Sequence, residues 1–498
     1  MKYRNRVPRA SHVNQGTGSK DLEAPTTGKT GVMRHPTLHL TEDDGITTAY
    51  GGLALAAGLV QRLGLAKVLA DGMKLLRSRR PFSEADHVLT HVYNLYIGGG
   101  CIEDIGYLQG SEAVRRLLGA ERLPDPTTAG DFLRRFGKAE LEKLDACIDE
   151  GQRRVWKQRY GKRKQELALV DLDSHVRPVY GAKKEGADFS YKGTWAYHPL
   201  VITLAGTQEI LRLVNRPGNV ASAEGAEVHL ASVMPMLCDR FRRVVVRGDS
   251  AFCNRHIIET CEQFGQFFAI VMAGYPNVQE LAEAVPERSW RPFVPRPVRE
   301  RAPVPKESRR RKRKERRRAK ALSRRKRDLH LVRQWVTEVP YQPGRCDRPY
   351  RLIIRRQLIE ETDDQGQLFE LYRYRFALSN IDDASPQDVL DLTYGRCDQE
   401  NIVEQLQNGV AAMRMPTGEL LANAAFLTCA RLAHNLKSWL AQLALPLETM
   451  RWEWKRFRLA FLYIAATVVH HARQVVVRLA RSHRFYEQVV LAHQRLVA

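Results

Sequence analysis

The chain has 498 residues, a length at which a single hydrophobic core stops growing, so we expect two to four structural units. Hydrophobic residues make up 44% of the chain, which is typical of a globular protein rather than a disordered one. The formal net charge of +23 predicts a polyanionic partner, most commonly nucleic acid, although charge alone does not separate DNA from RNA or from an acidic membrane.

The cysteines and the apolar segments indicate the cellular compartment in which the protein is expected. The eight cysteines form no Cys-x-x-Cys pair and no Cys/His pairing at zinc-finger spacing, so we interpret them as reduced thiols. No apolar segment follows the early basic residues, which argues against a secretory signal. The uncharged run 459–471 is shorter than the roughly 20 residues that cross a bilayer. We therefore expect a cytoplasmic protein with no membrane partner.

The N-terminal third predicts a tail followed by helices. Residues 1–36 are rich in Gly, Thr, Ser and Lys without hydrophobic periodicity, so we expect a flexible basic tail. Residues 37–160 show helical periodicity, with Ser83 and Asp86 at capping-box spacing before an apolar run that glycines close at 98–100. We predict a helical N-terminal DNA-binding domain over 37–160.

One segment of this domain carries two adjacent arginines. A helix is expected to start near residue 125 and to carry Arg134 and Arg135 near its beginning. Two interpretations are open, the reading helix of a helix-turn-helix and a plain surface helix.

From residue 161 the pattern changes to strands. Strand-like runs alternate with Gly, Pro and helical signals at 166–173, 198–205, 209–215, 242–249 and 266–272. Three strands in a meander, followed by strand and helix in alternation, give the order of a ribonuclease-H-like sheet. We predict a mixed α/β core whose first part spans 161–274.

This core is interrupted by an insertion at 275–371. Its tract 299–328 holds 17 Lys and Arg against 4 Asp and Glu, and such blocks of like charge stay solvated. The tract is either a solubilising segment or a clamp on DNA phosphates, and in the second case binding falls steeply with salt. The candidate phosphate contacts are Arg311, Lys312, Arg313, Arg316 and Arg317.

The remaining chain predicts a return to the core and then helices. Strand character at 373–380 leads into a helix that ends near Gly409, so the second part of the core is placed at 372–415. C-terminal helices are expected over 416–498, with long apolar helices at 418–445 and 448–480.

The first candidate site residues are two aspartates in one apolar strand. Side chains alternate along a strand, so Asp171 and Asp173 project to the same face, roughly 6.6 Å apart. An acid in an apolar strand is costly to bury unless it coordinates a cation or is paired. Either aspartate is a candidate metal ligand.

Two further acids follow at a distance. Asp249 ends a strand, where open α/β sheets expose ligands, and it is either a metal ligand or the N-cap of the following helix. Glu400 shares a helical face with Arg396, with which it would form an ordinary ion pair on a lone helix. Three carboxylates from two strands and a helix are what a two-metal phosphodiester-cutting site requires.

Five ordered motifs carry a family resemblance: 170–174, 197–203, 215–219, 247–252 and 396–401. With them the chain resembles, over about residues 40–440, the DDE transposases of bacterial insertion sequences, in the branch whose ribonuclease-H-like core is interrupted by an insertion before the catalytic Glu. The resemblance implies that Asp173, Asp249 and Glu400 are the catalytic, metal-binding acids. It prefers Asp173 to Asp171 because the family's first acid is typically followed by a small hydroxyl residue, here Ser174.

The last motif departs from the family pattern at two positions. Tyr394 stands one place too close to Arg396, and Gln407 stands where a lysine is expected. Both family positions are associated with grasping the terminal phosphate. Arg396 and Arg414 are the residues expected to compensate, and Arg216, in a turn between strand and helix, is a further candidate phosphate contact.

The implied function is cleavage at the ends of an insertion sequence and joining of the 3′-hydroxyl ends to target DNA. Two Mg²⁺ ions, with Mn²⁺ as a possible substitute, would activate water and stabilise the leaving oxygen. The expected partners are double-stranded DNA, as terminal inverted repeats and target, and a second copy in a homodimeric synaptic complex on the bacterial nucleoid. Trp335 either stacks on a flipped base or is a buried core residue.

Two other functions remain open. A ribonuclease-H-like nuclease would use the same three acids without strand transfer. A catalytically silent, transposase-derived DNA-binding protein would tolerate the loss of those acids.

Overall fold

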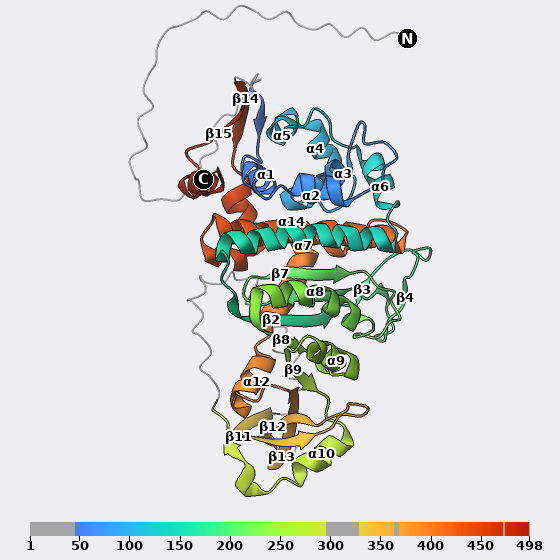
Figure 1. Ribbon diagram of the computed structural model, residues 1–498, viewed down its shortest axis with the longest axis vertical. Coiled ribbons are helices and arrows are strands. Elements are labelled where there is room, and N and C mark those ends of the chain that lie inside the picture. Colours follow the sequence, from blue (N-terminus) through green and yellow to red (C-terminus); the bar gives the residue numbers. More distant parts are fainter. Residues whose placement is uncertain (1–44, 295–327, 363–367, 472–473, 498) are drawn as a thin grey trace, which may run out of the picture. The chain divides into compact units, whose positions relative to one another are not determined.

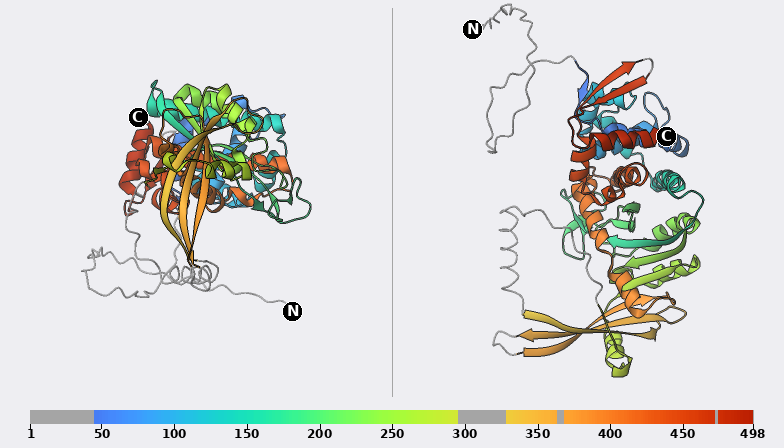
Figure 2. Two further views of the ribbon diagram at one scale, coloured as in Figure 1. Left: turned by 90° about the horizontal axis from the view of Figure 1, so that it is seen from below. Right: turned by 90° about the vertical axis from the view of Figure 1, so that its left-hand side faces the viewer.

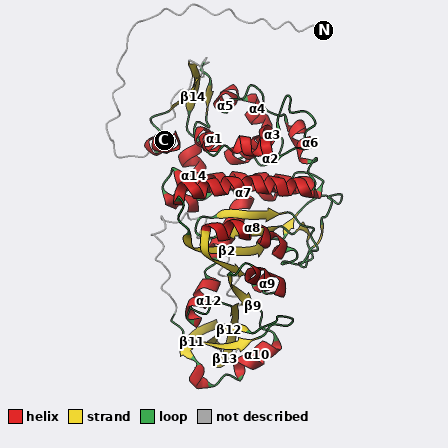
Figure 3. Ribbon diagram, in the orientation of Figure 1, coloured by secondary structure: helices red, strands yellow, loops and turns green. Residues whose placement is uncertain are grey.

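The computed structural model describes residues 45–294, 328–362, 368–471 and 474–497. Helices precede a large mixed sheet in the sequence, and further helices follow it (Figures 1 and 3). The mixed α/β class with terminal helices predicted from the sequence is therefore confirmed.

The described part of the N-terminal region is helical. Its helices are α1 (Leu53–Arg62), α2 (Leu65–Gly72), α3 (Glu84–Ile97), α4 (Ile105–Gly110), α5 (Glu112–Leu117), α6 (Pro126–Leu133) and α7 (Lys138–Tyr160). The predicted capping box of α3 is present, since Ser83 Oγ accepts from the Asp86 backbone N–H and the Asp86 carboxylate accepts from that of Ser83. Gly98 closes α3 with a φ of 111°, which favours glycine.

Five strands form the core of the sheet. They are β2 (Gln165–Ser174), β6 (Leu200–Leu204), β7 (Glu209–Val214), β8 (Phe241–Gly248) and β9 (Phe267–Met272), with α8 (Ala226–Arg240) and α9 (Arg255–Gln263) between the later strands. Their spatial order is β7-β6-β2-β8-β9, with β2 antiparallel to β6 and parallel to β8. The meander followed by strand and helix in alternation confirms the predicted ribonuclease-H-like order.

A second, small sheet lies between β2 and β6 in the sequence. Its strands are β3 (Arg177–Pro178), β4 (Asp188–Phe189) and β5 (Trp195–Tyr197), in the order β3-β5-β4. The chain enters it directly from the carboxyl end of β2, and Figure 1 shows β3 and β4 beyond that end. We call it the small sheet.

The insertion extends the core sheet. After α10 (Pro276–Glu283), β10 (Arg291–Pro292), β11 (Asp328–Tyr341), β12 (Tyr350–Thr362) and β13 (Leu368–Ser379) form an antiparallel meander. Residues 376–379 of β13 pair with β9, so the whole sheet has nine strands among the described residues. Figure 2 shows the three long strands side by side in yellow and orange. The predicted strand at 373–380 is confirmed.

The C-terminal region contains helices and a hairpin. Its elements are α12 (Pro386–Tyr394), α13 (Cys397–Asn408), η3 (Ala412–Arg414), α14 (Leu420–Leu443), η4 (Leu447–Arg451), α15 (Trp454–Phe457), η5 (Arg458–Leu462), β14 (Ala466–His471), β15 (Gln474–Leu479) and α16 (Tyr486–Val497). The helix predicted at 418–445 is confirmed as α14. The long helix predicted at 448–480 is wrong, because β14 pairs antiparallel with both β15 and β1 (Thr47–Thr48). Runs of β-branched valines favour this strand pairing over a helix.

Helix α14 packs against α3 and α7 of the N-terminal region and against β7 of the sheet. The contact includes what we call the buried ion network. Asp149 of α7 accepts from Arg212 of β7 at 2.8 and 2.7 Å and from Arg431 of α14 at 2.6 Å. The three side chains are at most 7% exposed. The carboxylate and the two guanidiniums therefore join three elements far apart in the sequence.

In the described residues no single helix is long and apolar enough to cross a membrane. The bent pair α1 and α2, 59° apart, passes that test together by length and composition.

Candidate active site

The two aspartates of β2 have different surroundings. Asp171 is 1% exposed and accepts from Arg247 of the neighbouring strand β8, at 2.6 Å from Nε and 2.8 Å from Nη2. The parallel register places these two residues opposite each other. Both carboxylate oxygens of Asp171 are thus engaged in a bidentate ion pair, which is the paired alternative for an acid in an apolar strand.

Asp173, two residues further on, lies at the end of β2 and is half-buried. Its Oδ1 accepts from the Ser174 backbone N–H at 2.8 Å. Burial raises the pKa of the Asp173 carboxyl, and the negative charges of Asp249 and Glu400 raise this pKa further, against the Ser174 hydrogen bond and the charge of Arg396. The three carboxylates, which we call the acid cluster, therefore act on one another electrostatically.

Asp249 follows the last residue of β8 and is exposed. Its Oδ1 accepts from the Ala251 backbone N–H at 3.0 Å and caps η1 (Ser250–Phe252). The N-cap interpretation is therefore confirmed. A cap uses one carboxylate oxygen, so it leaves the other able to bind a ligand.

Glu400 is positioned by the side chains that precede it on α13. Arg396 Nη2 donates to the Leu172 carbonyl of β2 at 2.8 Å, and Gln399 Nε2 donates to the Asp171 carbonyl at 3.2 Å. These bonds fix the start of α13 against β2, next to both aspartates. Glu400 itself is exposed.

Arg396 does not form the ion pair with Glu400 that a lone helix would favour. The Arg396 guanidinium also donates to the Gln399 side chain at 2.8 Å and lies 3.9 Å from Asp171. Its side chain is 15% exposed, so most of it is buried in holding α13 to β2.

The sequence analysis missed Arg247 and Gln399. Both are buried and both hold the backbone or side chain of Asp171. A signal existed for Arg247, because an arginine within an apolar strand needs a carboxylate partner. Gln399 gave no signal, since its partners are backbone carbonyls.

The acid cluster offers only carboxylate oxygens, the ligands that hard divalent cations prefer. Mutual repulsion of the three charges also favours a bound cation. Within the described residues, however, no three His, Cys, Asp or Glu side chains are grouped closely enough to hold a metal ion as they stand. Asp249 and Glu400 are exposed, and the described part of the chain shows neither in an ion pair. The donor set fits a divalent cation once these two side chains turn toward Asp173.

Two histidines border the cluster. His198 is buried and bonds through Nε2 to Ser174 Oγ and through Nδ1 to the Val220 carbonyl, both at about 3.0 Å. His175 contacts the side chain of Gln407 on α13. Gln407, which stands where the family has a lysine, thus contacts the strand end that carries Asp173.

Arg216 corrects one expectation. We predicted an exposed arginine in a turn, but Arg216 is 7% exposed and donates to three backbone carbonyls, those of His198, Ser222 and Glu224. Burial lowers the pKa of its guanidinium to about 10. The arginine holds its own loop together and is buried, which argues against the predicted role as a phosphate contact.

Arg134 and Arg135 were predicted near the beginning of a helix and instead follow its end. Asp125 caps α6 by accepting from the Thr128 N–H at 2.9 Å, and the helix stops at Leu133. Both arginines are exposed, and Arg134 pairs with Asp131 at 2.7 Å. A reading helix would present them from its first turns, so this geometry contradicts that interpretation.

The other predicted DNA contacts are Arg414 and five residues of the basic tract. Arg414 is exposed on η3, near Gly100. The candidates of the basic tract, Arg311, Lys312, Arg313, Arg316 and Arg317, lie outside the described residues.

Trp335 is half-buried on β11, so it is neither a free stacking surface nor a fully buried core residue. Its ring lies 4.9 Å from the Arg356 guanidinium, which also contacts Trp290 at 4.3 Å and Tyr372 at 4.8 Å. Arg356 in turn pairs with Glu287. The cluster fixes Trp335 within the insertion sheet.

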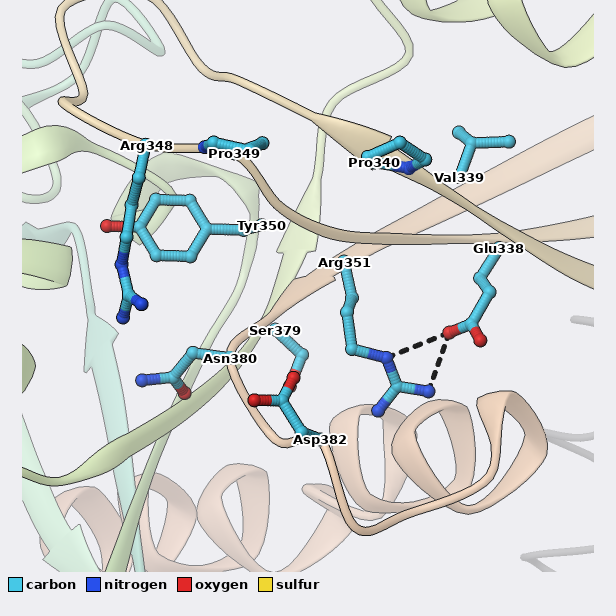
Figure 4. Close-up of a pocket in the computed structure, with 10 residues that line it drawn as sticks. All are labelled: Glu338, Val339, Pro340, Arg348, Pro349, Tyr350, Arg351, Ser379, Asn380 and Asp382. Carbon is cyan, nitrogen blue, oxygen red and sulfur yellow. Dashed lines mark hydrogen bonds and ion pairs between the residues drawn. The ribbon is translucent and has the colours of Figure 1, made fainter.

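A pocket of about 410 Å³ lies in the insertion, away from the acid cluster (Figure 4). It is lined by residues of β11, by 348–351 and by 379–382. Its two arginines are already paired, Arg351 with Glu338 at 2.6 Å and Arg348 with Glu262. The pocket contains none of the three acids and presents no free cation for a phosphate.

Comparisons with known proteins show the family of the chain. The family model described as "Transposase DDE domain group 1" matches residues 31–498. A search of curated proteins gives no match. Among solved structures, a cryo-EM structure of a piggyBac transposase synaptic complex with hairpin DNA aligns with 82% of this chain and 82% of its own, at 10% identity and a TM-score of 0.30.

Proposed function

Because the chain belongs to the group 1 family of DDE transposases, we propose that Asp173, Asp249 and Glu400 form the catalytic centre at which it cleaves the ends of an insertion sequence and joins them to target DNA. Membership of this family means that the chain is a DNA transposase, an enzyme that cleaves and joins DNA. The assignment of residues, metal and strand-transfer step is our proposal.

One observation carries the assignment of the site. Asp173 and Asp249 lie at the carboxyl ends of β2 and β8, which are neighbouring parallel strands, and open sheets present ligands at such ends. Arg396 and Gln399 hold the start of α13 against the same end of β2. Glu400 is the next residue of that helix. These contacts support a common site at the carboxyl end of β2, although Asp173 and Glu400 are more than 200 residues apart in the sequence.

The residues have distinct roles in the proposed centre. Asp173 is the first metal ligand, because Arg247 already engages both oxygens of Asp171. Asp171, Arg247, Arg396 and Gln399 are positioning residues that fix β2, β8 and α13 relative to one another. Asp249 and Glu400 complete the ligand set by rotation about their side-chain bonds.

The family uses divalent metal ions, and we propose Mg²⁺, with Mn²⁺ as a substitute. When bound, the metal would supply Lewis-acid activation of water and stabilisation of the leaving 3′-oxygen. The carboxylates of the acid cluster would hold the metal, and its positive charge would relieve their mutual repulsion.

The proposed DNA substrates are the terminal inverted repeats of the element and its target. Arg414 is an exposed cation available for backbone contacts, and the basic tract at 299–328 supplies 17 further Lys and Arg. Joining two ends at one target calls for two copies of the site, so we propose a homodimer that acts on the bacterial nucleoid.

The test is cleavage by acid-to-amide variants. Asp249→Asn keeps the capping acceptor of η1 and removes one ligand charge, so Mg²⁺-dependent cleavage of element ends should fall at least about a thousandfold, roughly 4 kcal/mol of transition-state stabilisation, while DNA binding persists. Glu400→Gln should do the same. Matched controls are Asp239→Asn on α8 and Glu404→Gln one turn along α13, both exposed.

The outcomes separate the candidate functions. Cleavage by Asp249→Asn at the parental rate would contradict the assignment of the catalytic acids. A parent that binds element ends but does not cleave them in Mg²⁺ would favour a silent, transposase-derived DNA-binding protein. Cleavage by the parent without joined products, in the presence of a supercoiled target, would favour the nuclease.

A further inference from the structure

The small sheet carries an unusual surface for a soluble fold. Tyr180, Phe189 and Tyr191 are 91%, 63% and 71% exposed. They are three of the seven exposed aromatic side chains in the described residues, and they fall within twelve positions of one another. Clustered exposed apolar groups of this kind mark a binding surface.

The backbone of the small sheet holds these rings in place. Phe189 of β4 stands opposite Trp195 of β5, with ring centroids 5.5 Å apart. The Trp195 indole N–H donates to the Gly181 carbonyl at 3.3 Å, which ties the loop carrying Tyr180 to the same strand. The rings are therefore presented from one short sheet rather than from unrelated loops.

Lysines accompany the aromatic rings. Lys183 and Lys192 are exposed, and Lys192 Nζ lies 5.3 Å from the centre of the Tyr191 ring. Lys184, by contrast, is engaged with the carbonyls of Met415 and Thr417. Two cations beside three rings give the surface the charge that complements a phosphate backbone.

Side-chain contacts link the small sheet to the strand end that carries Asp173. The Tyr191 ring lies 5.9 Å from His198, and His198 bonds to Ser174, the residue after Asp173, at 3.0 Å. A strand bound here would lead directly to the acids.

We propose that the small sheet binds a single-stranded stretch of the DNA substrate, whose bases stack on Tyr180, Phe189 and Tyr191 and whose phosphates contact Lys183 and Lys192. The proposal rests on the function proposed above. Bases within a duplex are covered by their neighbours, so exposed rings can stack only on bases freed from it. Rings interleaved with lysines are the usual surface for such strands, whereas a protein partner would favour an apolar patch without excess positive charge.

The test measures binding without cleavage. Full-length protein carrying Asp249→Asn, in chelator, is titrated against an oligothymidine of about 12 nucleotides with one internal 2-aminopurine, and against a fully paired duplex. Stacking should quench the 2-aminopurine of the single strand. Tyr180→Ala, Phe189→Ala and Tyr191→Ala should each weaken single-strand binding by roughly 5- to 100-fold, and duplex binding by less than about twofold.

Controls separate stacking from folding. Tyr191→Phe keeps the ring and should retain binding. Tyr107→Ala removes a ring that is 73% exposed on α4 and should change nothing. An unchanged single-strand affinity in the three alanine variants would overturn the proposal, and so would an equal loss on single strand and duplex.

The failure of this proposal is distinguishable from the failure of the proposed function. The titration uses uncut DNA without metal, so it reports on the small sheet whether or not Asp249 is catalytic. Cleavage that survives Asp249→Asn would contradict the active site alone.

Discussion

The buried ion network and the acid cluster both place carboxylates against the same sheet, yet their electrostatics are opposite. Burial alone would raise the pKa of Asp149, but the charges and hydrogen bonds of Arg431 and Arg212 lower it overall. At Asp173 the balance is reversed, and the pKa is raised by burial and by two neighbouring acids. The chain compensates charge where it joins α7, β7 and α14, and leaves charge uncompensated at the edge where we place metal binding.

The same contrast is repeated within β2. Asp171 and Asp173 are two residues apart, but Arg247 faces only the first. One strand can therefore carry a structural aspartate in an ion pair and a second aspartate that we propose as a metal ligand. Removing a charge should destabilise the protein in the compensated positions and not in the acid cluster.

The largest expected effect comes from breaking the buried ion network. Among the described residues, Arg431→Met leaves Arg212 as the one guanidinium that pairs with both Asp145 and Asp149, so the network keeps one uncompensated carboxylate charge. The free energy of unfolding should therefore fall by about 3–5 kcal/mol. Arg153→Met, on the exposed side of α7, should change it by less than about 1 kcal/mol. Denaturant unfolding measures both, and equal effects would remove the distinction between the two regions.

The next effect separates the two aspartates of β2. Asp171→Asn leaves the Arg247 guanidinium without its charged partner and should destabilise the protein by about 1.5–3 kcal/mol. Asp173→Asn removes a repelled charge and should leave stability unchanged or higher when divalent metal is absent. Thermal unfolding of both variants in chelator measures the difference, and a stable Asp171→Asn protein would contradict the role given to the ion pair.

Metal addition should act on the acid cluster alone. At ten times its Kd, Mg²⁺ should stabilise the parent by roughly 1.4 kcal/mol through binding to the folded state. Asp173→Asn and Asp249→Asn should lose most of this gain, whereas Arg431→Met should keep it. Stabilisation that persists in both aspartate variants would place the metal elsewhere.

The smallest effect is a difference in the sign of pH dependence. The pKa of Asp173 is raised in the folded protein, so ionisation of this carboxyl opposes folding. Asp173→Asn should therefore become more stable than the parent as pH rises through the folded pKa. Below the unfolded pKa near 3.8 the two proteins should not differ in this respect. The pKa of Asp149 is lowered in the folded protein, so its ionisation favours folding. This stabilisation should be present above pH 3.8 and should be lost as pH falls through the folded pKa of Asp149. Unfolding series of Asp173→Asn and Asp149→Asn in chelator measure both, and slopes of the same sign would contradict the comparison.

The sequence by itself determined the fold class, the order of the core strands and the caps of α3. It also indicated Asp249, Glu400 and one of the two aspartates of β2 as candidate ligands, and the family resemblance preferred Asp173. These features follow from local patterns, because alternation, helical periodicity and capping residues act between positions close in the chain.

The tertiary structure decided which partner each charge meets. Only the register of β2 with β8 pairs Asp171 with Arg247, and only the folded loop buries Arg216 among carbonyls. The hairpin at Ala466–Leu479 likewise depends on pairing with β1, more than 400 residues away. Partners distant in sequence set the burial and compensation of a charge, so the division between structural and candidate catalytic acids was not readable from the residues alone.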